Sequence, residues 1–257
     1  MKQMLDEAFS SFDFDKTLIL SVSGGRDSTA MALALWDYTV LYPDNYDIRL
    51  LYETTGFNKS KATATVKRLA KNTGWHLDIV KYQGDKRPIQ ILKESFRAIP
   101  KALKIIEEGD RKTYKKVFAC CKHLKKKPAK LYIKKSNPDK VIIAIGFKIG
   151  DKALHRYYRM KELVEWNTYF RTKVNGYTYF YPLRDCQEKD IDTILRNFGY
   201  GDTESSGCWL CPIFCVAKWH KKDPESDIKS RVYARGLGIE FPDSEQLTLR
   251  ESCTKQE

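Results

Sequence analysis

Residues 16–35 read KTLILSVSGGRDSTAMALAL, and the fold expected for the whole chain follows from this stretch. Its first part, residues 17–22, is a short apolar run rich in β-branched residues. Two adjacent glycines follow, and after them come strong helix formers, among them three alanines and two leucines. This order predicts a buried strand, a tight glycine turn and then a helix.

The turn itself, Ser23–Ser28, has the features of a phosphate-binding loop. Its two glycines let the backbone approach a ligand closely and direct consecutive N–H groups at it. The helix that follows adds the positive end of its dipole, and the two serines add hydroxyl groups. Asp27 is the unusual member, because a carboxylate beside phosphates is repelled unless a cation lies between them. We therefore expect Mg²⁺ at Asp27 and assign this residue a catalytic role. An ordinary glycine-rich turn is the alternative.

This loop is neither a Walker A motif nor the dinucleotide fingerprint. It resembles the PP-loop, S-G-G-x-D-S, of the ATP pyrophosphatase superfamily. The resemblance implies an adenine nucleotide as ligand and, in most members, cleavage between the α- and β-phosphates. Arg26 stands where lysine is frequent in that superfamily, which keeps the charge but changes the geometry. The nucleotide-binding residues expected in the loop are Ser23, Gly24, Gly25, Arg26, Asp27 and Ser28.

The rest of the chain alternates between strand-like and helix-like patterns, which predicts an α/β fold. We expect a parallel twisted sheet flanked by helices, Rossmann-like and similar to the adenine nucleotide α-hydrolases, with ligands at the carboxyl ends of the strands. Residues 1–200 form the expected nucleotide-binding domain, and residues 201–257 an irregular, cysteine-containing appendage. Besides the opening strand and helix, strands are expected over residues 46–52, 75–82, 141–147 and 177–183, and helices over residues 59–73, 88–106 and 188–198.

The composition describes a basic globular protein. The 257 residues include 46 Lys and Arg against 33 Asp and Glu, a formal net charge of +13. This excess suggests a polyanionic partner such as nucleic acid, although basic enzymes that bind only nucleotides are common. No apolar run approaches the roughly 20 residues that span a bilayer, and the first residues do not resemble a signal peptide. We therefore expect a cytoplasmic protein without a membrane partner.

Seven cysteines without a secretion signal point to metal or redox chemistry rather than to disulfides. Cys208 and Cys211 form a C-x-x-C pair, a spacing that presents two thiolates to one metal centre. The adjacent pair Cys120-Cys121 is the obvious source of two more ligands. Adjacent cysteines suit a cubane cluster, whose ligand sites are spread over several irons, better than a single Zn²⁺. A Zn²⁺ site that includes Cys215 or a histidine, and inert buried thiols, are the alternatives.

The loop and the two cysteine pairs together resemble the phosphoadenosine phosphosulfate (PAPS) reductase-like family over about residues 16–215. Cluster-bearing members include adenosine phosphosulfate (APS) reductases and the sulfurtransferases of DNA phosphorothioation. In them such cysteines hold a [4Fe–4S] cluster near the nucleotide. The metal ligands that this resemblance implies are Cys120, Cys121, Cys208 and Cys211. Further stretches that carry the resemblance are Cys120-Cys121-x-x-Leu124-Lys125-x-x-Pro128, Gly146-Phe147-Lys148 ahead of Arg156, and Pro182-Leu183-x-Asp185 ahead of Asp190-Ile191.

Four residues outside the loop and the cysteine pairs are further candidates. The resemblance implies that Gly146 belongs to the nucleotide site, and Arg156 is our first choice for a phosphate or sulfate clamp. Cys215 is a substitute ligand, a sulfur-carrying thiol or a core residue. Reductases of this family end in Glu-Cys-Gly with a nearby histidine, whereas residues 251–255 read Glu-Ser-Cys-Thr-Lys. Cys253 is therefore a candidate mobile nucleophile that departs from the family pattern.

Two mechanisms share this site. In the first, ATP and Mg²⁺ bind at the loop, a substrate oxygen attacks the α-phosphorus, and pyrophosphate leaves. The adenylated substrate then accepts sulfur. We expect this acceptor to be a nucleic acid, DNA or tRNA, and we expect a sulfur-donor protein such as a cysteine desulfurase or thioredoxin to supply the sulfur. In the second, APS or PAPS binds, a cysteine attacks its sulfur, and sulfite forms. The net charge and the missing tail motif favour the first. A non-catalytic nucleotide- or nucleic-acid-binding module with structural Zn²⁺ is the third interpretation.

Overall fold

The computed structural model describes residues 6, 16–42, 47–109, 114–148, 170–174, 176–204, 206–216 and 223–240. The chain divides into two compact units that interleave along the sequence. Unit 1 takes the described residues of segments 1–53, 59–80 and 129–207, and unit 2 takes those of segments 54–58, 81–128 and 208–257. The domain boundary at residue 200 stays a prediction.

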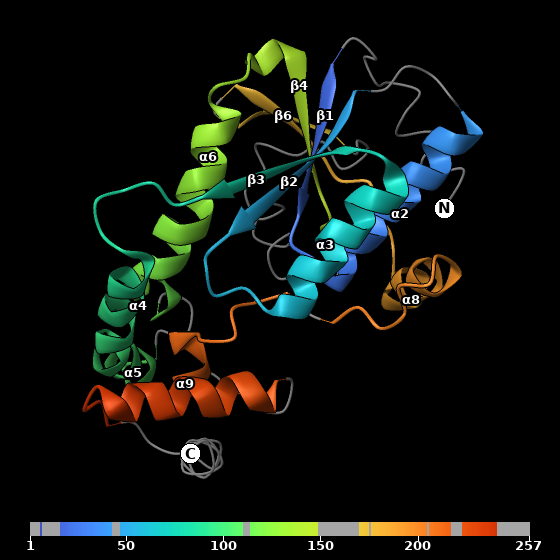
Figure 1. Cartoon of the computed structure of the whole chain (residues 1–257). Helices are drawn as coiled ribbons and strands as arrows, with labels where there is room; N and C mark the ends of the chain where they lie inside the picture. Colours follow the sequence, from blue (N-terminus) through green and yellow to red (C-terminus); the bar gives the residue numbers. More distant parts are fainter. Residues whose placement is uncertain are drawn as a thin grey trace. The chain divides into compact units, whose positions relative to one another are not determined.

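Unit 1 is built on a six-stranded sheet in the order β3-β2-β1-β4-β6-β5 (Figure 1). Its strands are β1 (Thr17–Val22), β2 (Ile48–Thr54), β3 (His76–Lys81), β4 (Val141–Ile145), β5 (Phe170–Val174) and β6 (Tyr177–Phe180). Five of them form a parallel sheet, while β5 runs antiparallel to β6. In register, Leu20 of β1 lies between Leu50 of β2 and Ala144 of β4. The parallel α/β fold expected from the sequence is confirmed.

Helices cover both faces of this sheet (Figure 1). They are α2 (Arg26–Leu41), α3 (Ser60–Thr73), α6 (Lys127–Ile133) and α8 (Glu188–Asn197). The helices α2, α3 and α8 share one core with the sheet, in which Leu20 is fully buried together with Leu33 and Ile194. On the opposite face, Ile133 of α6 packs with Ile143 of β4. Burial on both faces is the reason why β1 and β4 read as continuous apolar runs.

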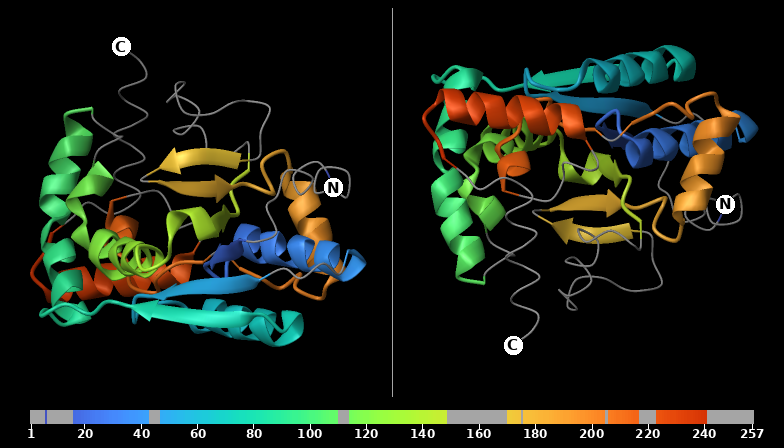
Figure 2. Two further views of the ribbon diagram at one scale, coloured as in Figure 1. Left: turned by 90° about the horizontal axis from the view of Figure 1, so that it is seen from above. Right: turned by 90° about the horizontal axis from the view of Figure 1, so that it is seen from below.

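Most elements of unit 1 lie within three residues of their expected positions, including the helices expected over residues 59–73 and 188–198. The strand β5 was not expected. It lies beside β6 in both views of Figure 2 and forms one end of the sheet. Its sequence, Phe-Arg-Thr-Lys-Val, lacks the apolar run of a central strand. An edge strand pairs on one side only, so the pattern that reveals β1 and β4 does not apply to it.

Unit 2 is helical in its described part. Its elements are α4 (Pro88–Arg97), α5 (Ile99–Glu107), η1 (Tyr114–Val117), η2 (Cys121–Lys126), η5 (Pro212–Cys215) and α9 (Pro224–Gly236). They enclose a second apolar core that contains Phe96 and Phe118. The helical pattern expected over residues 88–106 is confirmed, and the chain divides it into α4 and α5 with Ala98 between them. Pro100 lies in the first turn of α5, where its missing N–H is tolerated, and a proline inside a continuous helix would break it.

The helix α9 corrects an expectation, since residues 201–257 were expected to be irregular. Asp223 caps this helix by accepting a hydrogen bond from the Ser226 N–H at 3.3 Å, and a proline follows the cap. The buried face of α9 includes Ser226, Ser230 and Ala234. Because these side chains are small or polar, the helix shows no apolar periodicity in the sequence.

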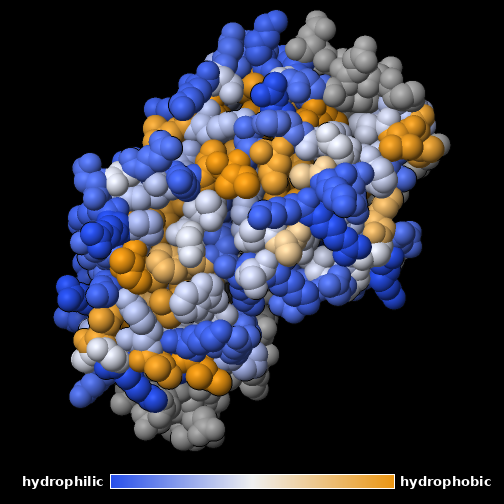
Figure 3. Space-filling model, in the orientation of Figure 1, coloured by the Kyte–Doolittle hydropathy of each residue, from blue (hydrophilic) through white to orange (hydrophobic). Residues whose placement is uncertain are grey.

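No described helix is both long and apolar enough to cross a bilayer. On the face drawn in Figure 3, hydrophilic residues separate the apolar patches from one another. This pattern agrees with a composition in which 31% of the residues are charged.

Candidate functional site

The loop after β1 lies where the connections of the sheet diverge. From β1 the chain continues to β2 on one side, whereas β4, the other neighbour of β1, pairs on its far side with β6. In open parallel sheets, ligands bind at the carboxyl ends of the strands beside such a switch point. The segments that follow β1 and β4 are Ser23–Ser28 and Gly146–Lys148. The structure therefore brings the loop and Gly146 together, as the sequence analysis expected.

Close backbone contacts hold this loop in place. Gly24 has a φ of +72°, and a Cβ at this position would lie 2.1 Å from the carbonyl oxygen of Ala62 in α3. A Cβ on Gly146 would lie 2.9 Å from the carbonyl oxygen of Asp27. Both distances are far below van der Waals contact, so any side chain would displace backbone. The glycines are thus required by the way in which β1, α3 and the end of β4 meet.

The hydroxyl groups of the loop bond within the loop. The Ser23 N–H donates to Ser28 Oγ at 3.1 Å, and the hydroxyl oxygens of the two serines lie 3.0 Å apart. Ser28 Oγ also donates to the Gly25 carbonyl at 3.1 Å. Gly25 is the N-cap residue of α2, and no side chain caps this helix. The first N–H groups of α2 therefore lack a capping side chain, which is the arrangement that suits an anion at a helix N-terminus.

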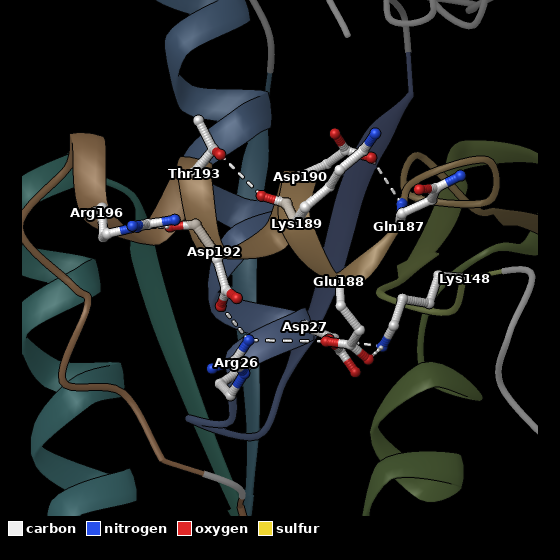
Figure 4. Close-up of polar contacts among 10 residues, drawn as sticks. All are labelled: Arg26, Asp27, Lys148, Gln187, Glu188, Lys189, Asp190, Asp192, Thr193 and Arg196. Atoms are coloured by element: carbon white, nitrogen blue, oxygen red, sulfur yellow. Dashed lines mark hydrogen bonds and ion pairs between the residues drawn. The ribbon is translucent and has the colours of Figure 1, made fainter.

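Five charged side chains form a network beside the loop (Figure 4). Arg26 and Asp27 begin α2, Lys148 follows β4, and Glu188 and Asp192 lie on α8. The Lys148 Nζ lies 2.9 Å from Asp27 Oδ1 and 3.1 Å from Glu188 Oε1. Arg26 pairs with Asp192, and its guanidinium lies 3.7 Å from Glu188 Oε2. The lysine side chain is only 7% exposed, whereas that of Glu188 is 67% exposed.

The network gives Asp27 a partner that the sequence analysis did not consider. We expected Mg²⁺ to separate this carboxylate from bound phosphates, and here an ammonium group contacts it. A carboxylate oxygen is a suitable ligand for Mg²⁺, so the residue fits the ion, and the ion stays a prediction. Lys148, Glu188 and Asp192 were not predicted as site residues. The available signals were a lysine shortly after an apolar strand and two acidic residues four apart at the start of a helix.

The first cysteine pair lies at the start of a π-helical segment of unit 2. Cys120 precedes η2 and Cys121 begins it. Turns of π-helix are rare in proteins, and those that occur are often found at functional sites. The Cys120 N–H donates to the Oγ of Ser95, a buried residue of α4, at 2.9 Å. The thiol hydrogen bond between the two cysteines lowers the pKa of Cys121 to about 6, with help from Lys125 and Lys126, and raises the pKa of Cys120.

The second pair is held by hydroxyl groups as well. The Cys208 sulfur lies 3.3 Å from Thr55 Oγ1, and the Cys211 N–H donates to Ser230 Oγ of α9 at 2.9 Å. Burial raises the pKa of both thiols, to about 12 for Cys211. Negative charge on Cys121 adds to the increase of the pKa at Cys208 and Cys211. The two pairs therefore lie in the same part of unit 2.

The four thiols do not form a closed metal site in this structure. Within the described ranges, no group of three or more His, Cys, Asp or Glu side chains is arranged to hold a metal ion. Their chemistry nevertheless suits an iron–sulfur cluster, because four thiols belong to one unit and cysteine thiolates are the ligands of such a cluster. The residues fit the group chemically, and the cluster stays a prediction.

The remaining candidates are distributed over the chain. Cys215 is fully buried in the core of unit 2, and burial raises its pKa to about 12, which favours a packing role over sulfur transfer. Cys186, expected to be a packing residue, is buried in the core of unit 1. Arg156 and Cys253 lie outside the described residues.

The strand order, the glycine loop between β1 and α2, and the helices on both faces define an α/β fold of the adenine nucleotide α-hydrolase-like class. No protein-family model and no curated protein matches the sequence.

Three solved structures are among those similar to this chain. A PAPS reductase from Candida auris in complex with phosphate is 14% identical, with 81% of this chain and 87% of that chain covered at a TM-score of 0.50. The U34-tRNA thiolase NcsA from Methanococcus maripaludis with its [4Fe-4S] cluster is 16% identical, with 93% and 78% covered at a TM-score of 0.48. The NH3-dependent NAD synthetase from Campylobacter jejuni is 12% identical, with 94% of each chain covered at a TM-score of 0.43. At 14% identity, the likeness to the PAPS reductase concerns the fold alone.

A prediction follows from the packing of Gly24. Gly24→Ala combines a left-handed φ with the contact to Ala62, so we expect it to lower the free energy of unfolding by about 3 kcal/mol or more. Gly74→Ala is the matched control, since Gly74 has a φ of +73° with no atom within 4 Å, and we expect a loss of about 1 kcal/mol. Urea denaturation of both variants measures the difference. Equal losses would contradict the packing argument.

Proposed function

We propose that this chain is an ATP-dependent enzyme of the PP-loop type, which adenylates a substrate oxygen so that a sulfur nucleophile can replace this oxygen, with AMP as the leaving group. The observation that carries this proposal is the Ser23–Ser28 loop, located at the carboxyl end of β1 and at the N-terminus of α2. The loop sequence, its position at the switch point of a parallel sheet and the N-terminus without a capping side chain all suit the phosphates of a nucleotide. The shared fold of solved structures is compatible with this role and does not carry it.

The expected chemistry is an in-line displacement at phosphorus. A substrate oxygen attacks the α-phosphorus of ATP, the bond from that phosphorus to the bridging oxygen breaks, and pyrophosphate leaves with the electron pair. The backbone N–H groups of the loop and the first turn of α2 would stabilise the charge that develops on the leaving pyrophosphate. Asp27 would hold the Mg²⁺ that accompanies the phosphates. Arg156 is proposed as a further phosphate clamp.

The cysteine pairs are the proposed site of the sulfur chemistry. Cys120, Cys121, Cys208 and Cys211 would hold a [4Fe–4S] cluster, which supplies an iron site for binding and passing on sulfur. The hydroxyl groups of Thr55, Ser95 and Ser230 contact these cysteines or their backbone and would orient them. A structural Zn²⁺ on the same thiols is the alternative.

A nucleic acid is the proposed acceptor of the sulfur. The formal charge of +13 favours a polyanion, and the lysines at positions 122, 126 and 127 are exposed next to Cys121. Salt-dependent contacts between lysines and phosphates are the usual source of affinity for such a partner. DNA and tRNA both satisfy this chemistry, and a cysteine desulfurase or a thioredoxin-like protein is the proposed source of sulfur.

Asp27 provides the first test of this function. Asp27→Ala should reduce ATP-dependent pyrophosphate release in the presence of bulk tRNA or DNA by about 100-fold or more, because the metal–phosphate contact is lost. Asp37→Ala, which removes an exposed carboxylate further along α2, should leave the rate unchanged. Retained turnover in Asp27→Ala would remove the assigned role of this residue. Sulfite formation from APS or PAPS, without pyrophosphate release from ATP, would instead indicate a reductase.

The metal content provides the second test. Protein purified without oxygen should contain about four irons and four acid-labile sulfides per chain, as a [4Fe–4S] cluster requires. Cys121→Ala and Cys208→Ala should lose this iron. Cys186→Ala, which alters a buried thiol in the core of unit 1, should keep it. Unchanged iron content in the first two variants would refute the assignment of the four cysteines as ligands. Protein that contains zinc but no iron, and that releases no pyrophosphate, would support a non-catalytic module.

Cys253 separates the two enzymatic interpretations. Cys253→Ala should leave sulfur transfer to nucleic acid intact, because Cys253 stands in Glu-Ser-Cys-Thr-Lys and not in the Glu-Cys-Gly sequence of the reductases. The same substitution would abolish a thiol-dependent reductase. Sulfur incorporated into tRNA or DNA, measured by mass spectrometry of the nucleosides, is the readout, and loss of incorporation in the variant would refute our assignment of the tail.

A further inference from the structure

Two cations beside the loop are neutralised by carboxylates from a neighbouring helix. The ammonium group of Lys148 and the guanidinium group of Arg26 both lie within 4 Å of the Glu188 carboxylate, at 3.1 and 3.7 Å. Figure 4 shows Glu188 between these cations, at the start of α8. Arg26 belongs to the loop itself, and Lys148 contacts the loop residue Asp27. The carboxylate thus bridges the positive groups that border the proposed phosphate site.

A carboxylate and a phosphate oxygen are bound by the same donors, so they compete for the same cations. Of the side chains in this network, Glu188 is the one whose displacement costs least. Its side chain is 67% exposed, so water can solvate it as soon as it leaves Lys148. Lys148 is 7% exposed and Asp27 is 35% exposed, so neither can move into water as easily. When the Glu188 carboxylate leaves, the buried Lys148 ammonium keeps its contact with Asp27 at 2.9 Å, so the cation is not left without a carboxylate.

The charge balance points the same way. Among the described side chains of this network, two cations face three carboxylates. Phosphate groups that enter must therefore compete with these carboxylates for the two cations.

We propose that Glu188 is an internal competitor for the nucleotide: its carboxylate occupies Lys148 and Arg26 until the phosphate groups displace it. This inference rests on the proposed nucleotide site and adds a residue that regulates its affinity. Asp192 contacts the same guanidinium nitrogen of Arg26 as Glu188 does, and it keeps the guanidinium beside the loop during the exchange. In this arrangement Glu188 weakens nucleotide binding, and it does so most strongly when no metal ion accompanies the phosphates.

The direction of the effect distinguishes this role from a structural one. If Glu188 only fastened α8 to the loop, its removal would weaken nucleotide binding or leave it unchanged. If Glu188 competes, Glu188→Gln should bind ATP about tenfold more tightly in the absence of Mg²⁺, since one negative charge near the phosphates is removed. The gain should be smaller with Mg²⁺ present. Because the residue is exposed at the first position of α8, the variant is expected to fold.

Isothermal titration calorimetry with ATP and with adenosine, with and without Mg²⁺, tests this proposal. Adenosine has no phosphates, so its affinity should be the same for the wild-type protein and Glu188→Gln. Asp47→Asn is the matched control, because it removes one carboxylate from the same unit just before β2, away from the carboxyl ends of the strands. This control should bind ATP as the wild-type protein does. An equal gain in Asp47→Asn would mean that net charge alone is responsible, which would overturn the role of Glu188.

A double variant tests the cation on which the exchange depends. In Glu188→Gln combined with Lys148→Gln, the gain in ATP affinity should shrink, because one of the cations that Glu188 occupies is absent. Unchanged or weaker ATP binding by Glu188→Gln alone would overturn the inference while the nucleotide function stands. Failure of the wild-type protein and of Glu188→Gln to bind ATP at all would overturn the proposed function and the inference together.

Discussion

The turn after β1 can exist only because its second residue has no side chain. Gly24 combines a left-handed backbone with a distance of 2.1 Å from its would-be Cβ to the Ala62 carbonyl oxygen. This contact fixes the turn against α3, and α2 begins two residues later, without a capping side chain. The end of β4 approaches the same turn through Gly146. The position of every candidate side chain at this edge of the sheet depends on these backbone contacts.

The charged groups around this edge then follow from the topology. Because β1 and β4 are neighbours, the residues after each strand meet, which brings Lys148 to Asp27 although 120 positions separate them in the sequence. The helix α8 packs its apolar side on the core of unit 1 and turns Glu188 and Asp192 toward Arg26. Packing of apolar residues thus places an acidic surface beside a basic one, and the resulting ion pairs determine what charge a ligand encounters.

Much of the fold of unit 1 was accessible from the sequence, since strands buried on both faces leave long apolar runs such as that of β4. The loop could be predicted from the sequence as well, because its glycines stand between a strand pattern and a helix pattern. The pairing of Lys148 with Asp27 was not, since it depends on which strands are neighbours. The helix α9 was not predicted, because its buried face carries serines. The division between α4 and α5 was not predicted either, although Pro100 in the first turn of α5 is a signal for it. The four cysteines were predicted from the sequence as one ligand set, whereas the hydroxyl groups that contact them depend on the tertiary structure.

The strand β3 forms an open end of the sheet, with hydrogen-bonding groups on one side that no strand of the described sheet uses. Such an edge invites a strand from another molecule to pair with it, which leads to aggregation. Here the strand reads His-Leu-Asp-Ile-Val-Lys, and His76 and Lys81 at its ends are exposed. Asp78 near the start is engaged by the Tyr132 hydroxyl at 2.6 Å. An incoming strand would have to strip water from the exposed His76 and Lys81, which opposes pairing at this edge, whereas the exposed Ile79 between them offers an apolar contact.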